Sequence, residues 1–187
     1  MKYFLLDTSA IIHLYYSEEK LTKKVAELIS RKLSEDAFLY MPNFCIAETF
    51  NVFGKLRYRE RKKSQEEYEE IKGSFKDLVR GRSIIYSYEL SRYHVLNIDL
   101  LVPFEQTFTR INKKALSTFD LLVIAMGIEL VKIHGDRDFY IITAEKRMDL
   151  LCKNLRRLSL RTRRQFNISD DVVYPKSLYL HTDSIPK

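Results

Sequence analysis

Short apolar runs alternate along this chain with longer segments in which apolar residues recur every three or four positions. Runs typical of strands occupy residues 3–6, 37–41 and 139–143. Helical spacing is clear at residues 20–33 and 146–155, where charged residues fill the positions between the apolar ones. Strands that alternate with helices predict βαβ crossovers, and therefore an α/β fold whose mostly parallel central sheet is covered on both faces.

Two further segments are apolar almost throughout. Residues 44–53 form one of them, and residues 117–133 form the other, which ends at His134 and Gly135. Both segments have the length of a helix. Because a helix that is apolar on all sides is normally buried, we expect residues 44–53 to lie in the interior.

The middle of the chain has a less regular pattern. Dense charges with few apolar residues predict a solvated helical excursion over residues 55–82. Residues 83–86 and 94–98 resemble strands, although residues 88–102 would also suit a helix, and we favour the two strands. Residues 104–115 predict another helix.

The last part of the chain carries weaker signals. A strand is predicted at residues 171–174, followed by a frayed polar tail that ends at Lys187. No internal repeat or linker separates the segments, so we expect a single domain over residues 1–187.

Composition narrows the class of protein. The 187 residues are 45% hydrophobic and 30% charged, an ordinary globular balance, and the formal net charge of +7 weakly favours a polyanionic partner. Two cysteines cannot form a disulfide framework and fit a reducing compartment. Since no apolar run approaches the roughly 20 residues needed to cross a bilayer, we expect a soluble, cytoplasmic protein that makes no membrane contact.

Several of the most apolar segments each carry one isolated carboxylate. These residues are Asp7, Glu48, Asp120 and Glu145. A buried carboxylate needs a partner, and a divalent cation could serve all four where strand ends and helix starts meet at one sheet edge. Oxygen ligands without histidine or thiolate favour Mg²⁺ or Mn²⁺, and such ions activate water for phosphodiester hydrolysis.

Three of these carboxylates also have a structural explanation. Asp7 suits the N-cap of the next helix, and Asp120 completes a capping box with Ser117. Glu145 is an ordinary residue for a first helical turn, whereas Glu48 fits no cap position. The sequence leaves both interpretations open.

Two basic stretches, residues 55–63 and 153–164, are candidate nucleic-acid contacts. The alternative is a solvated helix face, which is about as favourable for the first stretch because acidic residues follow it. The residues that we single out are Lys55, Arg57, Arg59, Arg156, Arg157 and Arg161.

Four motifs in order resemble those of PIN-domain nucleases, which include VapC-type ribonucleases. They are Asp7-Thr8-Ser9-Ala10, Ala47-Glu48, Ser117-Thr118-Phe119-Asp120 and Thr143-Ala144-Glu145. The resemblance implies a three-layer fold with a parallel sheet between helices. It also implies that Asp7, Glu48 and Asp120 bind Mg²⁺ or Mn²⁺, with Glu145 as the fourth catalytic acid. We expect the hydroxyls of Thr8, Ser9 and Thr143 to orient these ligands or water.

The resemblance implies a metal-dependent endoribonuclease that acts on single-stranded regions of RNA. The alternative is a catalytically weak or inactive PIN-like scaffold that binds RNA or protein. A homodimer and an antitoxin partner are further expectations from the family. Two features depart from the family pattern: Glu145 replaces the usual aspartate, and the chain is longer than a typical VapC-type toxin.

Overall fold

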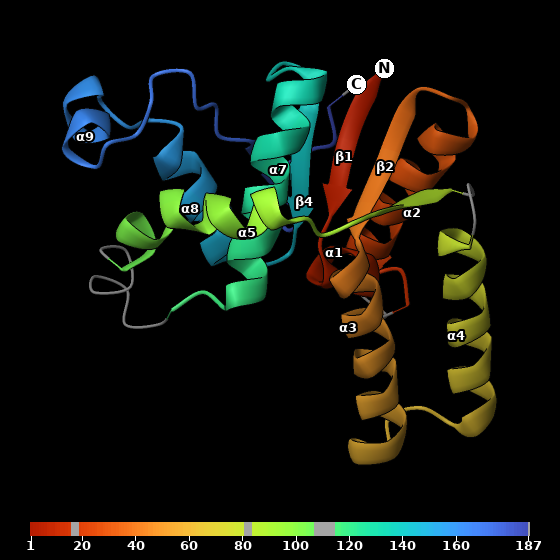
Figure 1. Ribbon diagram of the computed structural model, residues 1–187. Helices are drawn as coiled ribbons and strands as arrows, with labels where there is room; N and C mark the ends of the chain where they lie inside the picture. The colour runs from red at the N-terminus through yellow and green to blue at the C-terminus, as the bar shows by residue number, and fades with distance from the viewer. Residues whose placement is uncertain (16–18, 81–83, 107–114, 187) are drawn as a thin grey trace.

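A parallel sheet of five strands forms the centre of the computed structural model within its described residues, which are 1–15, 19–80, 84–106 and 115–186 (Figure 1). The strands are β1 (Lys2–Leu6), β2 (Ala37–Pro42), β3 (Ile85–Tyr88), β4 (Phe139–Thr143) and β5 (Lys176–Tyr179). Their order is β3-β2-β1-β4-β5, and all neighbouring pairs are parallel. The strand order reverses between β1 and β4. In open α/β sheets, ligands bind beyond the carboxyl ends of the strands at such a point.

Helices connect the strands. They are α1 (Thr8–Ile12), α2 (Glu19–Leu33), α3 (Asn43–Gly54), α4 (Gln65–Val79), α5 (Arg92–Asn97), α7 (Thr118–His134), α8 (Lys146–Leu155) and α9 (Leu160–Gln165). A π-helical turn at Lys55–Arg59 continues α3, and a 3₁₀ turn at Ile98–Leu100 continues α5.

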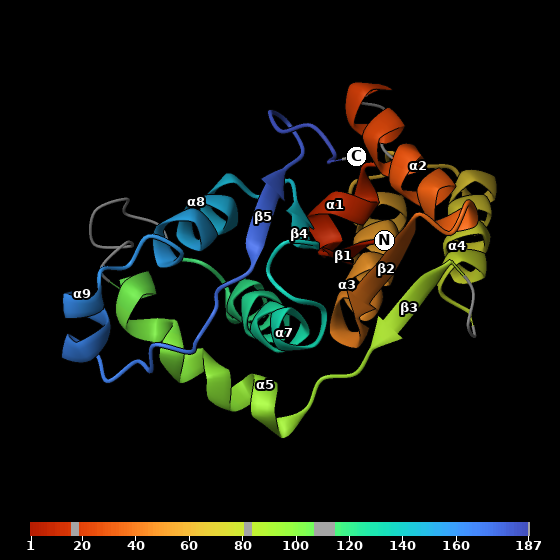
Figure 2. The same cartoon turned by 90° about the horizontal axis from the view of Figure 1, so that it is seen from above.

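Two neighbouring residues of β1 show how helices cover the sheet, because successive side chains of a strand point to opposite faces. Tyr3 stacks on His134 at the end of α7, with ring centroids 3.7 Å apart. The Arg31 guanidinium of α2 lies over the Phe4 ring instead. Helix α7 therefore covers one face of the sheet, with α5 packed against α7, and α2 covers the other face, as Figure 2 shows. The predicted three-layer α/β fold is confirmed.

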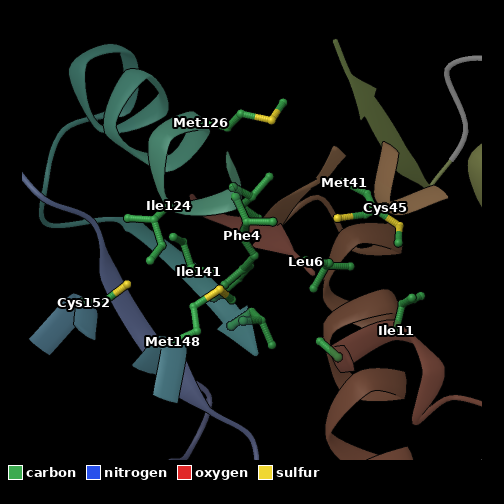
Figure 3. Packing of buried hydrophobic residues seen from close by; sticks show 14 of the residues in the cluster. Phe4, Leu6, Ile11, Met41, Cys45, Ile124, Met126, Ile141, Met148 and Cys152 are labelled. Carbon is green, nitrogen blue, oxygen red and sulfur yellow. The ribbon is translucent and has the colours of Figure 1, made fainter. Parts of the chain in front are cut away.

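The apolar core lies between the sheet and its helices. Figure 3 shows fully buried residues from both sides of this boundary, such as Phe4 of β1, Ile141 of β4 and Ile124 of α7. Gly127 lets α7 approach β4 closely, since an added Cβ would lie 2.8 Å from Cδ1 of Ile141. Tight packing of α7 on the sheet fixes the position of its first turn.

Two predicted strands were wrong. Residues 94–97 belong to α5 instead. The Ser91 backbone N–H donates to Nδ1 of His94 over 2.9 Å, and this hydrogen bond caps the start of the helix. Residues 171–174 are irregular, since side chains of Arg163 and Arg156 bind the carbonyl groups of Val172 and Tyr174 in place of a neighbouring strand. The last strand is β5, which follows directly.

The expectation of a buried helix at residues 44–53 was also wrong. Only one stripe of α3 is fully buried, formed by Cys45, Thr49 and Phe53. Phe53 packs edge-on against Phe75 of α4, with ring centroids 5.8 Å apart. The charged excursion is thus a helical hairpin in which α4 covers part of α3 (Figure 1).

The C-terminal tail is held in place rather than frayed. Lys24 of α2 donates to the carbonyl groups of Leu180 and Asp183, over 2.5 and 2.7 Å. Arg31 donates to the carbonyl of Pro186 over 2.5 Å. Of the helix predicted at 104–115, residues 104–106 are helical, and residues 107–114 lie outside the described ranges.

Candidate metal centre

The structure brings all four predicted carboxylates to one pocket, which holds about 240 Å³. Asp7 follows β1 and caps α1, and Glu145 follows β4 and caps α8. Glu48 comes from α3, and Asp120 comes from the first turn of α7. The pocket therefore lies at the carboxyl edge of the sheet, beside the point where the strand order reverses.

Asp7 is buried among neutral hydrogen-bond donors. Its side chain is held by the Thr143 hydroxyl at 2.6 Å, the Ala10 backbone N–H at 2.7 Å and the Ser9 hydroxyl at 2.8 Å. Burial raises the pKa of Asp7 to about 7; the hydrogen bonds oppose this rise, and the negative charge of Asp120 adds to it. The folded chain thus holds this carboxylate in place without neutralising it.

Strand pairing explains how Thr143 reaches Asp7. Because β1 and β4 are adjacent, the residues that follow them lie side by side, and the Asp7 backbone N–H donates to the Ile142 carbonyl over 3.2 Å. The Thr143 hydroxyl also accepts from the Glu145 backbone N–H over 2.8 Å. The Ser9 hydroxyl accepts from the Ala144 N–H, again over 2.8 Å. These hydroxyls join the two loops that carry Asp7 and Glu145.

Glu48 lies on the exposed face of α3. Its carboxylate accepts a hydrogen bond of 2.5 Å from the hydroxyl of Thr8, a residue that is almost fully buried. Each of the three hydroxyl residues predicted to orient the site therefore contacts one of the four acids or the backbone beside it.

Asp120 takes part in a capping box at the start of α7. Its Oδ2 accepts from the backbone N–H and the hydroxyl of Ser117, over 2.9 and 2.8 Å. Asp7 and Glu145 also act as N-caps. Asp7, Asp120 and Glu145 thus cap a helix and line the pocket at the same time, because the starts of these helices form the edge of the pocket.

The four carboxylates have no cationic partner within the described ranges, where no Lys or Arg forms an ion pair with any of them. In the same ranges, no three Asp, Glu, His or Cys side chains lie close enough to hold one ion as they stand. The donor atoms still fit Mg²⁺ or Mn²⁺ in kind, because they are carboxylate oxygens. Burial raises the pKa of the Cys45 thiol, so this pocket residue stays protonated.

An apolar wall, which the sequence analysis did not single out, completes the pocket. It is formed by Ile12, Val52, Phe119 and Val123. Phe119 is 52% exposed although it belongs to the largely buried helix α7. The sequence did carry a signal for this exposure. Phe119 lies within the capping box from Ser117 to Asp120, and a capping box lies at the surface end of a helix.

Arg147 is a second residue that the sequence analysis missed. Its Nη1 donates to the Ala115 carbonyl over 2.7 Å, which ties α8 to the segment just before α7. The Arg147 backbone N–H donates to the Glu145 side chain over 3.3 Å. Arg147 therefore links the helix starts that carry Asp120 and Glu145.

The two basic stretches lie at opposite ends of the molecule, one on the α3–α4 hairpin and one at α9 (Figures 1 and 2). In the first, Lys55 and Arg59 are exposed, and Arg57 donates to the Gln65 side chain over 3.1 Å. In the second, Arg156 forms an ion pair with Asp136.

Arg157 and Arg161 of the second stretch are exposed. Arg156 is different, because its guanidinium holds both Asp136 and the Tyr174 carbonyl in place. The structure gives this residue a structural task that the charge pattern did not indicate.

Among the described residues, no helix is long and apolar enough to cross a membrane. No curated protein matches the chain. Two solved structures are similar: VapBC2 from Rickettsia felis bound to a DNA fragment from its promoter, and FitAcB from Neisseria gonorrhoeae. The first is 12% identical with a TM-score of 0.49, covering 80% of this chain and 92% of that chain. The second is 14% identical with a TM-score of 0.44, covering 79% of this chain and 91% of that chain.

The family comparison concerns the part of the chain that builds the pocket. A PIN-domain model matches residues 4–145, a range that includes all four pocket carboxylates and most of the 187 residues. This chain therefore belongs to the PIN-domain family, whose members are in general nucleases.

Proposed function

We propose that this protein is a metal-dependent endoribonuclease that hydrolyses phosphodiester bonds in single-stranded regions of RNA. The observation that carries the proposal is the convergence of Asp7, Glu48, Asp120 and Glu145 in one pocket without a cationic partner among the described residues. In a PIN domain, such an acidic pocket is best explained as a site for divalent cations.

Asp7, Glu48 and Asp120 would hold Mg²⁺ or Mn²⁺, and Glu145 would act as the fourth acid, directly or through water. A bound divalent ion lowers the pKa of a water molecule and neutralises charge on the scissile phosphate. The chain itself orients the acids: Thr143 and Ser9 hold Asp7, Thr8 holds Glu48, and Ser117 holds Asp120.

The phosphate backbone of RNA would be held by cations on either side of the pocket. Lys55, Arg57 and Arg59 lie in the π-helical turn that follows α3 and precedes α4, Arg157 lies between α8 and α9, and Arg161 lies within α9. Cations that neutralise phosphates give an affinity that falls with increasing salt and depends little on sequence. We leave Arg156 out of this set because Asp136 already neutralises it.

A second candidate function is that of a PIN-like scaffold that binds RNA or protein without cutting it. The observation in its favour is that, within the described ranges, no three acidic, His or Cys side chains are close enough to share one ion. Isothermal titration with Mn²⁺ separates the two candidates. A nuclease should give saturable heat that disappears in Asp7→Asn, whereas a scaffold should give none.

Cleavage of labelled single-stranded RNA and DNA in Mn²⁺, with metal-free controls, tests the main proposal. We expect RNA cleavage by the wild-type chain. Asp7→Asn and Asp120→Asn should each reduce the rate more than about 100-fold, because loss of a ligand exceeds the 10–100-fold effect of losing a group that only orients one. Unchanged cleavage by either folded variant would contradict the assignment. Cleavage of DNA alone would leave a nuclease but exclude the RNA substrate.

Family membership also leads us to propose a homodimer and an antitoxin-type protein partner. Light scattering after size exclusion measures the mass of the isolated chain. A mass near 22.3 kDa would exclude the homodimer.

A further inference from the structure

We propose that Phe119, supported by Phe44, is a stacking site for one unpaired base of a single-stranded nucleic acid whose phosphate lies at the acidic pocket. This inference deepens the proposed function, since it rests on phosphate binding at Asp7, Glu48 and Asp120.

The first step of the argument is the exposure of Phe119. It lies in the first turn of α7. Asp120 follows it, and residues 121–128 of the same helix are all buried. Phe119 keeps 52% of its surface exposed. Ligand sites combine apolar or aromatic walls with a few convergent polar groups, and Phe119 is the exposed aromatic part of such a wall.

The second step is the way in which the ring is held. Phe44, in the first turn of α3, stacks on Phe119 with ring centroids 5.4 Å apart and an interplanar angle of 28°. The ring is therefore supported from one side, and more than half of its surface remains open. A base that stacks on the exposed part of Phe119 would extend this pair to three rings.

The third step is the position of this pair relative to the acids. Phe119 immediately precedes Asp120, and Phe44 lies one helical turn before Glu48 on the same side of α3. Phe119 also lines the same pocket as all four carboxylates. The ring pair thus shares helices α3 and α7 with Glu48 and Asp120, so an aromatic surface adjoins the place where a phosphate would be held.

The chemistry of nucleotides matches this arrangement. A nucleotide has a flat aromatic base and an anionic phosphate a few bonds apart, and every base can stack on an aromatic side chain. In a duplex, both faces of a base are already covered by its neighbours. A stacking site next to the cutting site therefore selects unpaired nucleotides with little dependence on their sequence.

Binding can be measured with single-stranded RNA that carries the fluorescent base 2-aminopurine, whose emission falls when it stacks. The full-length chain carries Glu145→Gln to slow cleavage, which keeps the three proposed metal ligands Asp7, Glu48 and Asp120, and it is titrated in Mn²⁺. We expect quenching with Phe119 and with Phe119→Tyr, which keeps the ring. Phe119→Leu should lose the quenching and bind at least about tenfold more weakly, in line with the loss of one base–aromatic stack.

Phe166→Leu is the matched control variant. Phe166 is also a partly exposed ring, at 37%, and packs on Phe104 with centroids 4.9 Å apart, but it lies outside the pocket. It should quench as well as the parent chain. Thermal melts of both leucine variants check that the fold is intact. If Phe119→Leu and Phe166→Leu quench the 2-aminopurine equally, whether both lose the quenching or both keep it, the stacking site is overturned. The exposed Phe119 ring would then be a contact for a protein.

Cleavage by the chain with Glu145 intact separates this inference from the proposed function. RNA with a single abasic nucleotide beside the cleaved bond should be cut at least about tenfold more slowly by the wild-type chain. The Phe119→Leu variant should cut the abasic RNA and the intact RNA at the same rate. If neither the abasic nucleotide nor Phe119→Leu changes the cleavage rate, the stacking site is contradicted and the nuclease assignment stands. Quenching that depends on Phe119 without any cleavage would keep the stacking site and contradict the nuclease.

Discussion

Asp7 and Asp149 are equally buried aspartates with different partners. Asp7 is 5% exposed and Asp149, in the first turn of α8, is 4% exposed. Asp149 forms an ion pair of 2.8 Å with Lys153 and accepts a hydrogen bond of 2.7 Å from the Ser177 hydroxyl. Asp7 receives only neutral donors, and the nearby Asp120 carboxylate opposes its charge.

The difference teaches how to separate a structural carboxylate from a functional one. Burial of a charge is unfavourable unless something compensates it, and the chain itself compensates Asp149. At Asp7 no cationic side chain of the described part of the chain does so, which leaves a proton or a divalent cation, and a bound cation would compensate the charge while keeping the carboxylate ionised. Burial alone would not have distinguished Asp7 from Asp149.

The largest expected effect concerns the hydroxyls that hold the two aspartates. Thr143→Val keeps the shape of the side chain but removes the donor to Asp7 and the acceptor for the Glu145 N–H. If Asp7 binds metal, turnover and Mn²⁺ affinity should each fall about 10–100-fold, as is typical when a group that orients a metal ligand is lost. Steady-state cleavage and Mn²⁺ titration measure these two quantities.

Ser177→Ala is the matched control, because the Ser177 hydroxyl donates to the other buried aspartate, Asp149. It should leave turnover unchanged while lowering the free energy of unfolding slightly. Equal losses of turnover in the Thr143 and Ser177 variants would show that the two aspartates do not differ in function.

The next effect concerns stability without metal, and the same substitution at both sites tests it. Asp149→Asn removes a compensated charge and weakens the contacts with Lys153 and Ser177, so the free energy of unfolding should fall by about 1–3 kcal/mol. Asp7→Asn removes a charge that nothing neutralises, so this free energy should not fall. Urea denaturation in a metal-free buffer measures both changes. A larger loss of stability in the Asp7 variant than in the Asp149 variant would reverse the comparison.

The sequence predicted the acidic pocket because its signal is local. Asp7, Glu48 and Asp120 each interrupt an apolar run, and parallel strands bring such interruptions to one edge of the sheet. Strands β1, β2 and β4 and helices α2, α7 and α8 were also predictable, because the strands and α7 are distinct apolar runs and the apolar residues of α2 and α8 have clear helical spacing.

The rest depends on contacts between distant parts of the chain. Asp149 resembles an ordinary surface residue paired with Lys153 four positions later, and its burial follows from Ser177, which is 28 residues away. The position of β5 depends on Arg156 and Arg163, which bind the carbonyl groups before it. The Phe44–Phe119 pair joins two helix starts that only the folded chain brings together.

His94 extends the comparison to a buried base and gives the smallest expected effect. It is 4% exposed, its Nδ1 accepts from the Ser91 backbone N–H over 2.9 Å, and its Nε2 lies 3.1 Å from the Tyr88 hydroxyl. Burial lowers the pKa of His94 below 6.5, although the negative charge of Glu129 opposes this shift.

Because the unfolded chain binds this proton more readily than the folded one, stability at His94 is present above pH 6.5 and is lost as the pH falls below it. Thermal melts at pH 7 and pH 5 should therefore show a larger decrease in Tm for the wild-type chain than for His94→Gln. We expect a difference of roughly 2 °C, which corresponds to somewhat less than 1 kcal/mol in a chain of this size. Equal decreases would mean that the folded chain accommodates the protonated imidazole with the help of the Glu129 charge, so that His94 would resemble Asp149, which has a charged partner, and not Asp7.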